Sequence, residues 1–475
     1  MNDRMQTITQ DQMSRVHDAS MKLLSDVGVA FNESEALALF ASNGFRVDGK
    51  TVFMTEAQVQ KALDSAPARF TVTARNPAKS VAVGGEDFVF APGYGAPFIA
   101  LPDGGQRHAT MADYDNFCKL IQTSTTMDMN GFMMVEPADV SPATAHLDML
   151  FSNIVLCDKP FMGSPVSKQG ARDCVAMAAL LWGGVDQLAQ TGPVCVSLIN
   201  SLSPLQFSDE MAGALIESAR CNQACVIASL VMAGSSGPVT LAGVMALQNA
   251  EILAGVTLAQ LVNPGAAVIY GSTSSAMDMR TGGLAIGCPE LSMVVSATAQ
   301  MARFYQLPSR SGGSLTDAHL PDAQAAAESV LALTTAVRNG IHFILHSAGI
   351  LGSYIAMSFE KFLLDEEMGA ILRKLIRPID FSAEAIDTPM IKRVGIGGQY
   401  LTQPSTFERC RTEFYTTDFF NRQNYPGWKD AGAKRIDQVA TEKLSERLAA
   451  YEKPPIDPDV ETALAAYVTQ RKNGT

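Results

Sequence analysis

The sequence lacks the charge and the long apolar segments that would indicate a nucleic-acid-binding or membrane protein. Only 18% of its 475 residues are charged, and the formal net charge is −12. A surface of this average charge repels a long anionic polymer, which excludes nucleic acid as an expected partner. The most apolar long stretch, residues 239–262, contains Gln248, Asn249, Glu251 and Gln260. These polar groups are costly together in a bilayer, so we expect a buried helix and no membrane association.

The eight cysteines include no C-x-x-C pair, and most of them lie inside apolar runs. This pattern is typical of reduced core thiols and disfavours a disulfide framework or a zinc knuckle. The N-terminal segment MNDRMQTITQDQ has neither an apolar core nor a small-residue cleavage site, as a secretory signal would. We therefore expect the protein in the cytoplasm.

Lysine is absent between Lys168 and Lys361, which disfavours a Schiff-base enzyme whose lysine would lie in that span. The six histidines are scattered, and only His342 and His346 are close in sequence. If they lie on one extended strand, they are roughly 13 Å apart, too far to share a metal ion. The Gly282/Gly283 and Gly312/Gly313 pairs lack the G-K-S/T and G-x-G-x-x-G context of phosphate loops, so we interpret them as turns.

The first 65 residues carry three helix starts, each a capping residue followed three positions later by Gln or Glu. The pairs are Thr9/Gln12, Asn32/Glu35 and Thr55/Gln58, and the first two helices are expected to end at Gly28 and Gly44. Residues 70–90 then indicate short antiparallel strands joined by turns. We predict an N-terminal helical and small β cap over residues 1–125.

From about residue 127, short apolar runs alternate with segments of helical pattern. Such runs are typical of parallel strands covered on both sides, and seven are clear: residues 129–135, 160–165, 194–200, 225–230, 267–272, 307–312 and 341–346. An eighth strand would close a (β/α)8 barrel of the TIM type over residues 126–400. Either residues 394–400 or a strand leading into Tyr94 could supply it. A doubly wound open sheet is the alternative.

The expected outer helices at 239–262, 288–305 and 321–337 are poor in Lys, Arg and Glu. An apolar outer face needs a cover, so we predict a homo-oligomer, with the helical region 429–471 of a C-terminal extension (401–475) supplying part of that cover.

Active sites of such barrels lie at the carboxyl ends of the strands. The polar residues that follow the apolar runs are Glu136, Ser164, Asn200, Ser235, Thr273, Arg310 and His346, and the aromatic residues able to reach the same face are Tyr94, Phe98, Tyr270, Tyr354 and Phe359. This set offers one acid, one arginine, one histidine and several aromatic rings, without an obvious nucleophile or acid–base pair. It suits a ligand with a cation and a carboxylate: aromatic faces and an acid hold a quaternary ammonium, and Arg with His binds the carboxylate. The chemistry would then come from a cofactor that a partner brings.

Over nearly its whole length the sequence resembles the trimethylamine methyltransferase superfamily, in particular its members without pyrrolysine. The resemblance is carried by residues 7–29, 52–77, 312–329 and 404–422. It implies a (β/α)8 barrel. The trimethylamine enzymes carry pyrrolysine close to the T-D-A segment, where this chain has Gly313, Ser314 and Leu315 before Thr316 and Asp317. The similarity thus implies a quaternary amine, such as glycine betaine, proline betaine or carnitine, as substrate.

The resemblance further implies that a methyl group passes from this amine, with glycine betaine the best candidate, to Co(I) of a separate corrinoid protein. No cofactor would be tightly bound, because the cobalamin belongs to that partner. From their strand-end positions we assign Tyr94, Phe98, Glu136, Tyr270, Tyr354 and Phe359 to the cation end, and Asn200, Arg310 and His346 to the carboxylate end. Two alternatives stay open: a metal-dependent lyase or hydrolase using Glu136, His342 and His346, and a betaine-binding protein without turnover.

Overall fold

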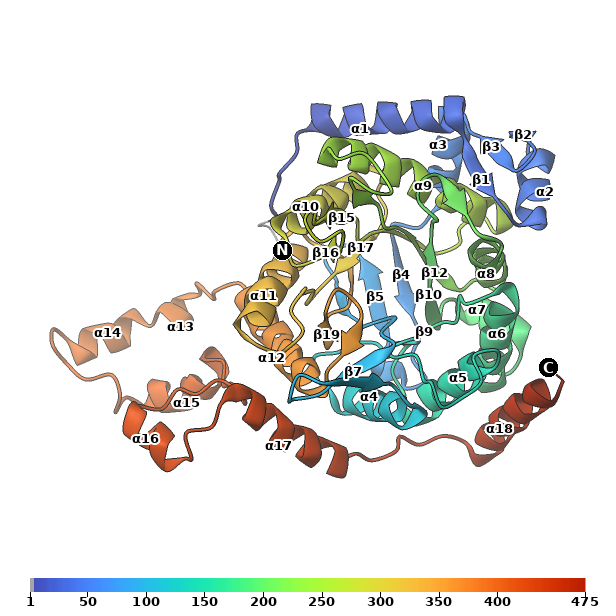
Figure 1. Cartoon of the computed structure of the whole chain (residues 1–475). Coiled ribbons are helices and arrows are strands. Elements are labelled where there is room, and N and C mark those ends of the chain that lie inside the picture. Colours follow the sequence, from blue (N-terminus) through green and yellow to red (C-terminus); the bar gives the residue numbers. More distant parts are fainter. Residues whose placement is uncertain (1–3, 475) are drawn as a thin grey trace.

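A curled parallel sheet forms the centre of the protein, whose computed structural model describes residues 4–474 (Figure 1). Six of the seven predicted runs form strands of this sheet, and the strand leading into Tyr94 joins them as β6. All neighbouring strands are parallel, in the order β6 (Val89–Phe90), β18 (Phe343–Leu345), β17 (Ser309–Gly312), β14 (Val268–Ser272), β12 (Ala224–Ser229), β10 (Cys195–Asn200) and β9 (Phe161–Met162).

The remaining predicted run closes the ring with only three residues, 128–130. The Asp128 amide donates to the Phe90 carbonyl over 3.0 Å, and Asn130 exchanges hydrogen bonds with Pro160 and Met162 over 2.8 and 3.0 Å. The segment therefore lies between β6 and β9 and completes a TIM barrel. The alternative placement of a strand at 394–400 is wrong, because α14 (Thr388–Val394) is helical and the residues after it are exposed turns with no strand beside them.

Helices surround the barrel, as the alternating pattern predicted (Figure 1). They are α4 (Met111–Thr123), α5 (Ala145–Leu156), α6 (Lys168–Trp182), α7 (Val185–Thr191), α8 (Asp209–Arg220), α9 (Leu241–Val262), α10 (Pro289–Phe304), α11 (Ala323–Arg338) and α12 (Phe359–Leu375). Of the helices within residues 4–474, α9 alone is long and apolar enough to cross a membrane, but 78% of its most apolar window is buried inside the protein. This agrees with the prediction of a buried helix.

The N-terminal segment forms a cap over α9. It comprises α1 (Gln10–Lys22) with a π-helical turn to Val27, β1 (Val29–Phe31), α2 (Ser34–Ser42), β2 (Arg46–Asp48), β3 (Thr51–Phe53) and α3 (Glu56–Ser65), and α1 and α3 pack on α9. The capping boxes of Thr9 and Thr55 are confirmed. The predicted Asn32/Glu35 cap is wrong, because the carboxylate of Glu33 receives the Ala36 amide and caps α2 instead. After the cap, β4 (Arg69–Val72) and β5 (Val81–Gly84) form the expected antiparallel pair.

Two small sheets border the carboxyl-terminal mouth of the barrel. One joins β19 (Ile350–Leu351), β20 (Ala356–Met357), β7 (Phe98–Ala100) and β8 (Gln106–His108), and we call it the lid sheet. The other joins β13 (Met232–Ala233), β15 (Ser275–Met277) and β16 (Leu284–Ala285). Both are built from loops that follow barrel strands, so they enclose the space above the strand ends.

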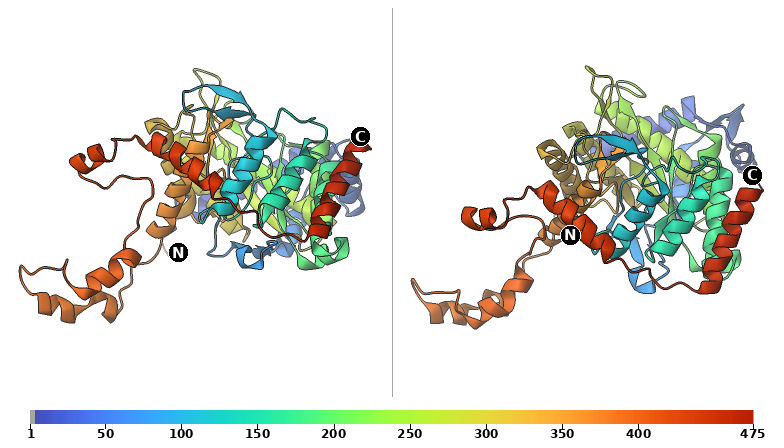
Figure 2. Two further views of the ribbon diagram at one scale, coloured as in Figure 1. Left: turned by 90° about the horizontal axis from the view of Figure 1, so that it is seen from below. Right: turned by 60° about the horizontal axis from the view of Figure 1, so that its bottom comes forward.

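The C-terminal region first leaves the barrel and then returns to it (Figure 2). Residues 377–424 form a projecting arm with α13 (Ala383–Ile386), α14 and α15 (Pro404–Glu413), followed by α16 (Tyr425–Asp430). Farther on, α17 (Ile436–Ala449) packs on α12 and α4, and α18 (Pro458–Asn473) packs on α5 and α6. The predicted C-terminal helices thus cover part of the outer ring of their own chain.

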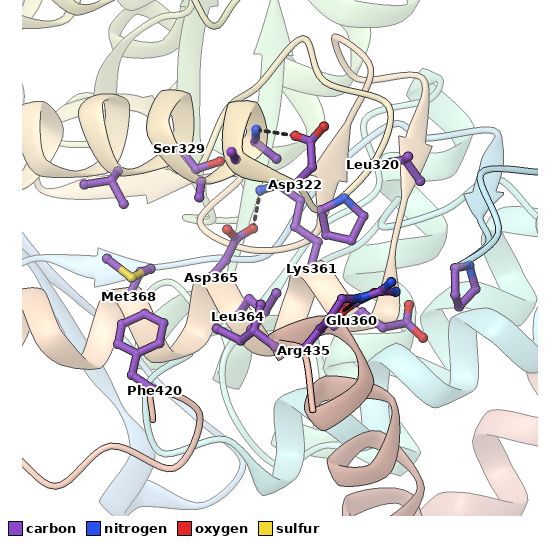
Figure 3. Close-up of a pocket in the computed structure, with 18 residues that line it drawn as sticks. Leu320, Asp322, Ser329, Glu360, Lys361, Leu364, Asp365, Met368, Phe420 and Arg435 are labelled. Atoms are coloured by element: carbon purple, nitrogen blue, oxygen red, sulfur yellow. Dashed lines mark hydrogen bonds and ion pairs between the residues drawn. The ribbon is translucent and has the colours of Figure 1, made fainter. Parts of the chain in front are cut away.

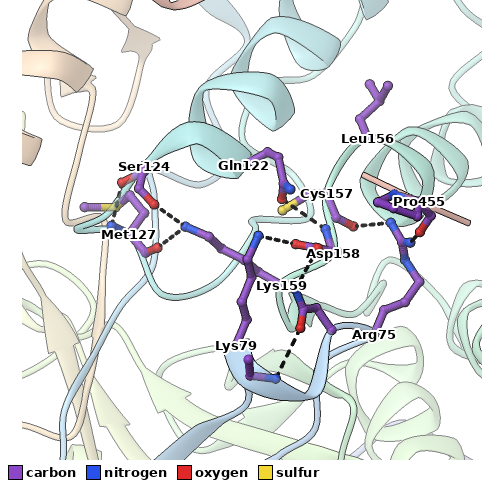
Figure 4. Close-up of polar contacts among 12 residues, drawn as sticks. Arg75, Lys79, Gln122, Ser124, Met127, Leu156, Cys157, Asp158, Lys159 and Pro455 are labelled. Atoms are coloured by element: carbon purple, nitrogen blue, oxygen red, sulfur yellow. Dashed lines mark hydrogen bonds and ion pairs between the residues drawn. The ribbon is translucent and has the colours of Figure 1, made fainter. Parts of the chain in front are cut away.

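Polar side chains hold the three-residue closing segment from the opposite, amino-terminal face of the barrel (Figure 4). The buried Lys159 ammonium donates to the carbonyls of Ser124 and Met127 over 2.7 and 2.6 Å, immediately before residues 128–130. Next to it, Asp158 pairs with Lys79 over 2.5 Å. Burial lowers the pKa of Lys159, and the nearby Cys157 and Asp128 oppose this decrease. The Lys159 side chain therefore adds hydrogen bonds next to the short closing segment, where a longer strand would form backbone hydrogen bonds.

Replacing Lys159 by Met should lower the free energy of unfolding by about 1–3 kcal/mol, because two buried carbonyls lose their donor. Thermal denaturation followed by circular dichroism measures the loss. The matched control is Lys61→Met, since Lys61 is exposed on α3. Equal melting temperatures for the two variants would contradict this role of Lys159.

Candidate functional site

Arg310 is the central residue of the barrel mouth. Its register partner on β14 is Gly271, which has no side chain. Arg310 is 1% exposed, and its Nη1 donates to the hydroxyl of Thr273 over 3.4 Å. No carboxylate among residues 4–474 forms an ion pair with it, and burial lowers its pKa to about 10. The group remains charged at neutral pH.

His346 and Tyr354 meet beside this arginine. Their ring centroids are 4.8 Å apart, and both residues have left-handed backbones, with φ of 57° and 76°. Hydrogen bonds from the His346 amide to Pro92 and from the Ser314 amide to the His346 carbonyl, of 3.0 and 2.8 Å, hold this conformation. Such backbone strain in non-glycine residues persists where surrounding structure fixes it, and it is concentrated at functional sites.

Tyr94 lies between Arg310 and Glu136. Backbone bonds join the loops that carry Tyr94 and Glu136, from Gly95 to Met133 (2.6 Å) and from Glu136 to Ala96 (3.0 Å). Burial raises the pKa of the Tyr94 phenol, the Glu136 carboxylate raises it further, and the Arg310 guanidinium opposes the rise. Glu136 itself is exposed at the rim, and its partial burial raises the pKa of its carboxyl.

Three polar atoms of this group lack a hydrogen-bond partner within the described chain: Nε of Arg310, Nδ1 of His346 and the hydroxyl of Tyr354. All three are buried, although such groups are nearly always satisfied in folded proteins. Burial and the nearby arginine hold the pKa of His346 well below its usual value, so the imidazole is neutral. Burial raises the pKa of Tyr354 to about 12, which keeps its hydroxyl protonated. These unsatisfied groups make the cluster the candidate ligand-binding site.

A buried ion pair behind the site holds two of its loops. The Lys361 ammonium contacts Asp365 at 2.6 Å and donates to the Ser314 carbonyl at 3.1 Å, while the Asp365 carboxylate accepts the Gly349 amide at 2.8 Å. Burial raises the pKa of Asp365 to about 6. The loop after β17 is thereby tied to the loop after β18. The sequence analysis missed this pair, although its i, i+4 spacing on one helix was a usable signal.

The structure brings Tyr94, Arg310, His346 and Tyr354 together, with Thr273 as an added neighbour. Asn200 ends β10 with an exposed side chain, and it is paired with Ala228, which belongs to the same cluster of interior residues as Leu198. Glu136 and Asn200 are thus placed at the strand ends, around the deeper group.

Three predicted cation-binding residues do not reach the deeper group. Tyr270 points outward from β14, where its hydroxyl donates to Asn249 of α9 over 2.9 Å. Phe359 stacks on Phe117 at 4.3 Å, in the packing between α12 and α4. Phe98 belongs to the lid sheet, where its ring lies 4.8 Å from that of His108. Strand parity explains the first error, because Tyr270 is one position away from Gly271, which faces inward.

The residues of the metal-site alternative are also separated. His342 lies at the start of β18, where its Nδ1 contacts the Ser309 hydroxyl at 3.0 Å and its Nε2 contacts the Gly85 carbonyl at 3.2 Å. Both ring nitrogens are occupied by the protein, and burial lowers the pKa of His342 to about 4. In the part of the chain that the structure covers, no three His, Cys, Asp or Glu side chains are grouped to hold a metal ion.

Fold and site together define a TIM-barrel protein in which a buried guanidinium lies at the carboxyl ends of the strands, with tyrosine and histidine rings beside it and an exposed carboxylate near one of the tyrosines. The chain belongs to the family described as trimethylamine methyltransferase (MTTB), which matches residues 2–475. It is therefore a member of a methyltransferase family.

Individual relatives match almost end to end. A glycine betaine methyltransferase of Desulfitobacterium hafniense (strain Y51) is 46% identical, with 98% of this chain and 96% of the relative covered. A proline betaine:corrinoid methyltransferase of Eubacterium limosum is 33% identical, with 96% and 95% covered. Among solved structures, the monomethylamine methyltransferase of Methanosarcina barkeri matches with a TM-score of 0.53 at 12% identity, covering 94% of this chain and 89% of that one. This last likeness supports the barrel fold.

Replacing Tyr270 by Phe should lower the free energy of unfolding by about 1–3 kcal/mol, because Asn249 loses a buried donor. The affinity for ligands of the pocket should stay unchanged, since Tyr270 faces the helices. Thermal denaturation and titration calorimetry with glycine betaine measure the two effects. A changed affinity with an unchanged melting temperature would show that Tyr270 lines the pocket after all.

Proposed function

We propose that this protein transfers a methyl group from glycine betaine to Co(I) of a separate corrinoid protein, and releases dimethylglycine. The observation that carries the proposal is the buried Arg310 guanidinium, which has no carboxylate partner within residues 4–474. A buried charge without a partner costs several kcal/mol, so a ligand that brings a carboxylate gains strongly from binding there. Two of the relatives described above are named as methyltransferases of glycine betaine and proline betaine, which supports the same substrate class.

The order of charges along the pocket matches a small zwitterion. Arg310 and the neutral His346 lie at the base, where they donate hydrogen bonds to a carboxylate. Tyr94 and Tyr354 line the wall, and aromatic faces attract a quaternary ammonium that has no N–H to donate. Glu136 supplies a negative charge at the rim, beyond Tyr94. A betaine bound in this direction presents its methyl groups to the mouth.

The reaction needs little from the protein beyond this orientation. The methyl carbon forms a bond to the cobalt while its bond to nitrogen breaks, and the electron pair of that bond stays on nitrogen. Because the nitrogen is positively charged before the reaction, the amine leaves neutral and no proton has to move. The residues of this chain hold the carboxylate, aim one methyl along the barrel axis and exclude water. The cobalamin belongs to the corrinoid partner, so we expect no tightly bound cofactor here.

Mixing the protein with glycine betaine and Co(I) cobalamin should convert the Co(I) absorbance spectrum to that of methylcobalamin and produce dimethylglycine in equal amount. Omitting the betaine is the control. The proposal fails if glycine betaine, proline betaine and carnitine all give no methyl transfer. Tight binding of glycine betaine without product, in the presence of a competent corrinoid protein, would identify a binding protein instead.

Replacing Arg310 by Ala should weaken glycine betaine binding about 10- to 100-fold, because a charge-assisted bond to the carboxylate is lost. Choline has the same ammonium without a carboxylate, so its binding should change little. Titration calorimetry with both ligands measures the difference, and Arg280→Ala, on an exposed loop, is the matched control. Equal losses for both ligands would remove Arg310 from the carboxylate role.

A further inference from the structure

The projecting arm, residues 377–424, exposes large apolar side chains that its own chain does not cover. Phe381, Leu401 and Phe407 are 76%, 82% and 78% exposed. Ile379, Ile396 and Phe414 are similarly exposed. Solitary exposed apolar residues are ordinary, but a concentration of this kind marks an interaction site.

The arm is a folded element and not a loose linker. An ion pair of 2.7 Å between Arg409 and Glu384 joins α15 to α13, and the Lys374 ammonium at the end of α12 donates to the Thr412 carbonyl over 3.3 Å. Helix α14 is capped by the Asp387 side chain. The apolar side chains are therefore presented on a preformed scaffold, which limits the entropy lost on docking.

Charge distinguishes the arm from the rest of the molecule. Residues 377–424 contain six acidic and six basic residues, so the whole net charge of −12 lies outside the arm. Two copies of the remaining surface repel each other, whereas a neutral arm that carries Lys392 and Arg393 near its tip approaches an acidic body without that cost.

A matching apolar groove lies at the base of the arm (Figure 3). It is a pocket of about 530 Å³ between α11, α12 and the start of α17, with Ala326, Val330, Leu364, Met368 and Phe420 in its lining. Terminal helices of the same chain pack on α9, α12, α5 and α6, but the main helix contacts of α11 are with its neighbours α10 and α12. The groove is the part of the outer ring where the apolar surface expected from the sequence stays open.

We propose that two copies of this chain form a symmetric dimer in which the arm of each lies in the α11–α12 groove of the other. A two-fold axis makes this exchange reciprocal, so each copy uses both of its open surfaces. Phe381, Phe407 and Phe414 are 76%, 78% and 70% exposed, and a buried aromatic side chain covers about 150–250 Å², so their exposed parts offer roughly 340–560 Å² per copy. With the aliphatic side chains of the arm, the area approaches the roughly 800 Å² per partner of a stable interface.

The position of the arm favours a second copy over the corrinoid protein. A corrinoid has to reach the barrel mouth, on the side of the lid strands. In the left view of Figure 2 those strands lie at the top, and the arm bends toward the bottom. The dimer does not depend on the proposed reaction.

Light scattering or sedimentation of the full-length protein at micromolar concentration should give twice the chain mass of 50.7 kDa. Phe407→Asp and, independently, Leu401→Asp should give the monomer mass, because each places a charge in the apolar interface. The control is Val239→Asp, since Val239 is 71% exposed but lies outside the arm. Circular dichroism verifies that each variant is folded.

The groove is tested by Ala326→Arg, which fills it from the exposed side of α11 and should also give monomers. Dimers that persist in Ala326→Arg, or that are lost in Val239→Asp, would place the interface elsewhere. A monomeric wild type would overturn the proposal, and a change of mass only after addition of a corrinoid protein would assign the arm to that partner.

Discussion

The structure depends on one uncompensated positive charge at the centre of the barrel mouth. Arg310 is 1% exposed, and its contact with the described protein is a long hydrogen bond to Thr273. Burying a charge costs several kcal/mol even after relaxation, so the fold has to hold this residue by other means. It does so by placing Arg310 on a central strand opposite Gly271 and by tying the adjoining loops through Lys361 and Asp365. The unpaired charge of Arg310 thus lowers the stability of the fold, and in the proposed function the carboxylate of the ligand compensates for this loss.

Burial and this charge together determine the state of the neighbouring groups. Burial lowers the pKa of His346 and the Arg310 charge lowers it further, so the imidazole stays neutral and can donate or accept a hydrogen bond. The same charge also opposes the rise in the pKa of Tyr94 and Tyr354 without ionising either phenol. His346, directly after β18, and Tyr354, between β19 and β20, both have left-handed backbones, and their rings lie 4.8 Å apart. Neutral side chains around a single cation suit the binding of a single carboxylate, as the proposed function requires.

The barrel was largely predictable, because continuous apolar runs between helices leave few other arrangements. The closure of the barrel could not be predicted, because β6 has only two residues. The segment 128–130 beside it is held by the Lys159 side chain as well as by backbone hydrogen bonds. Arg310, His346, Tyr94 and Tyr354 were found from their positions after strands. Tyr270 was not excluded, because a one-residue shift along a strand reverses the face of every side chain. Phe359 was misplaced because Phe117, on which it stacks, comes from a segment distant in sequence. The pairing of Phe98 with His108 in the lid hairpin was not predicted.

The chemistry of the leaving group explains why recognition, and not acid–base catalysis, occupies this pocket. A tertiary amine needs a proton or another electrophile before it can surrender a methyl group, whereas a quaternary amine already carries the charge that makes it leave. The trimethylamine enzymes that this chain resembles carry pyrrolysine near the position of Gly313 and Ser314. In this chain those residues form a backbone turn, and the Lys361 ammonium donates to the Ser314 carbonyl. Because the quaternary nitrogen is already activated for methyl transfer, the selectivity for the substrate has to come from its carboxylate end. In the proposed function the buried Arg310 supplies that selectivity, because a ligand without a carboxylate would leave the charge unpaired.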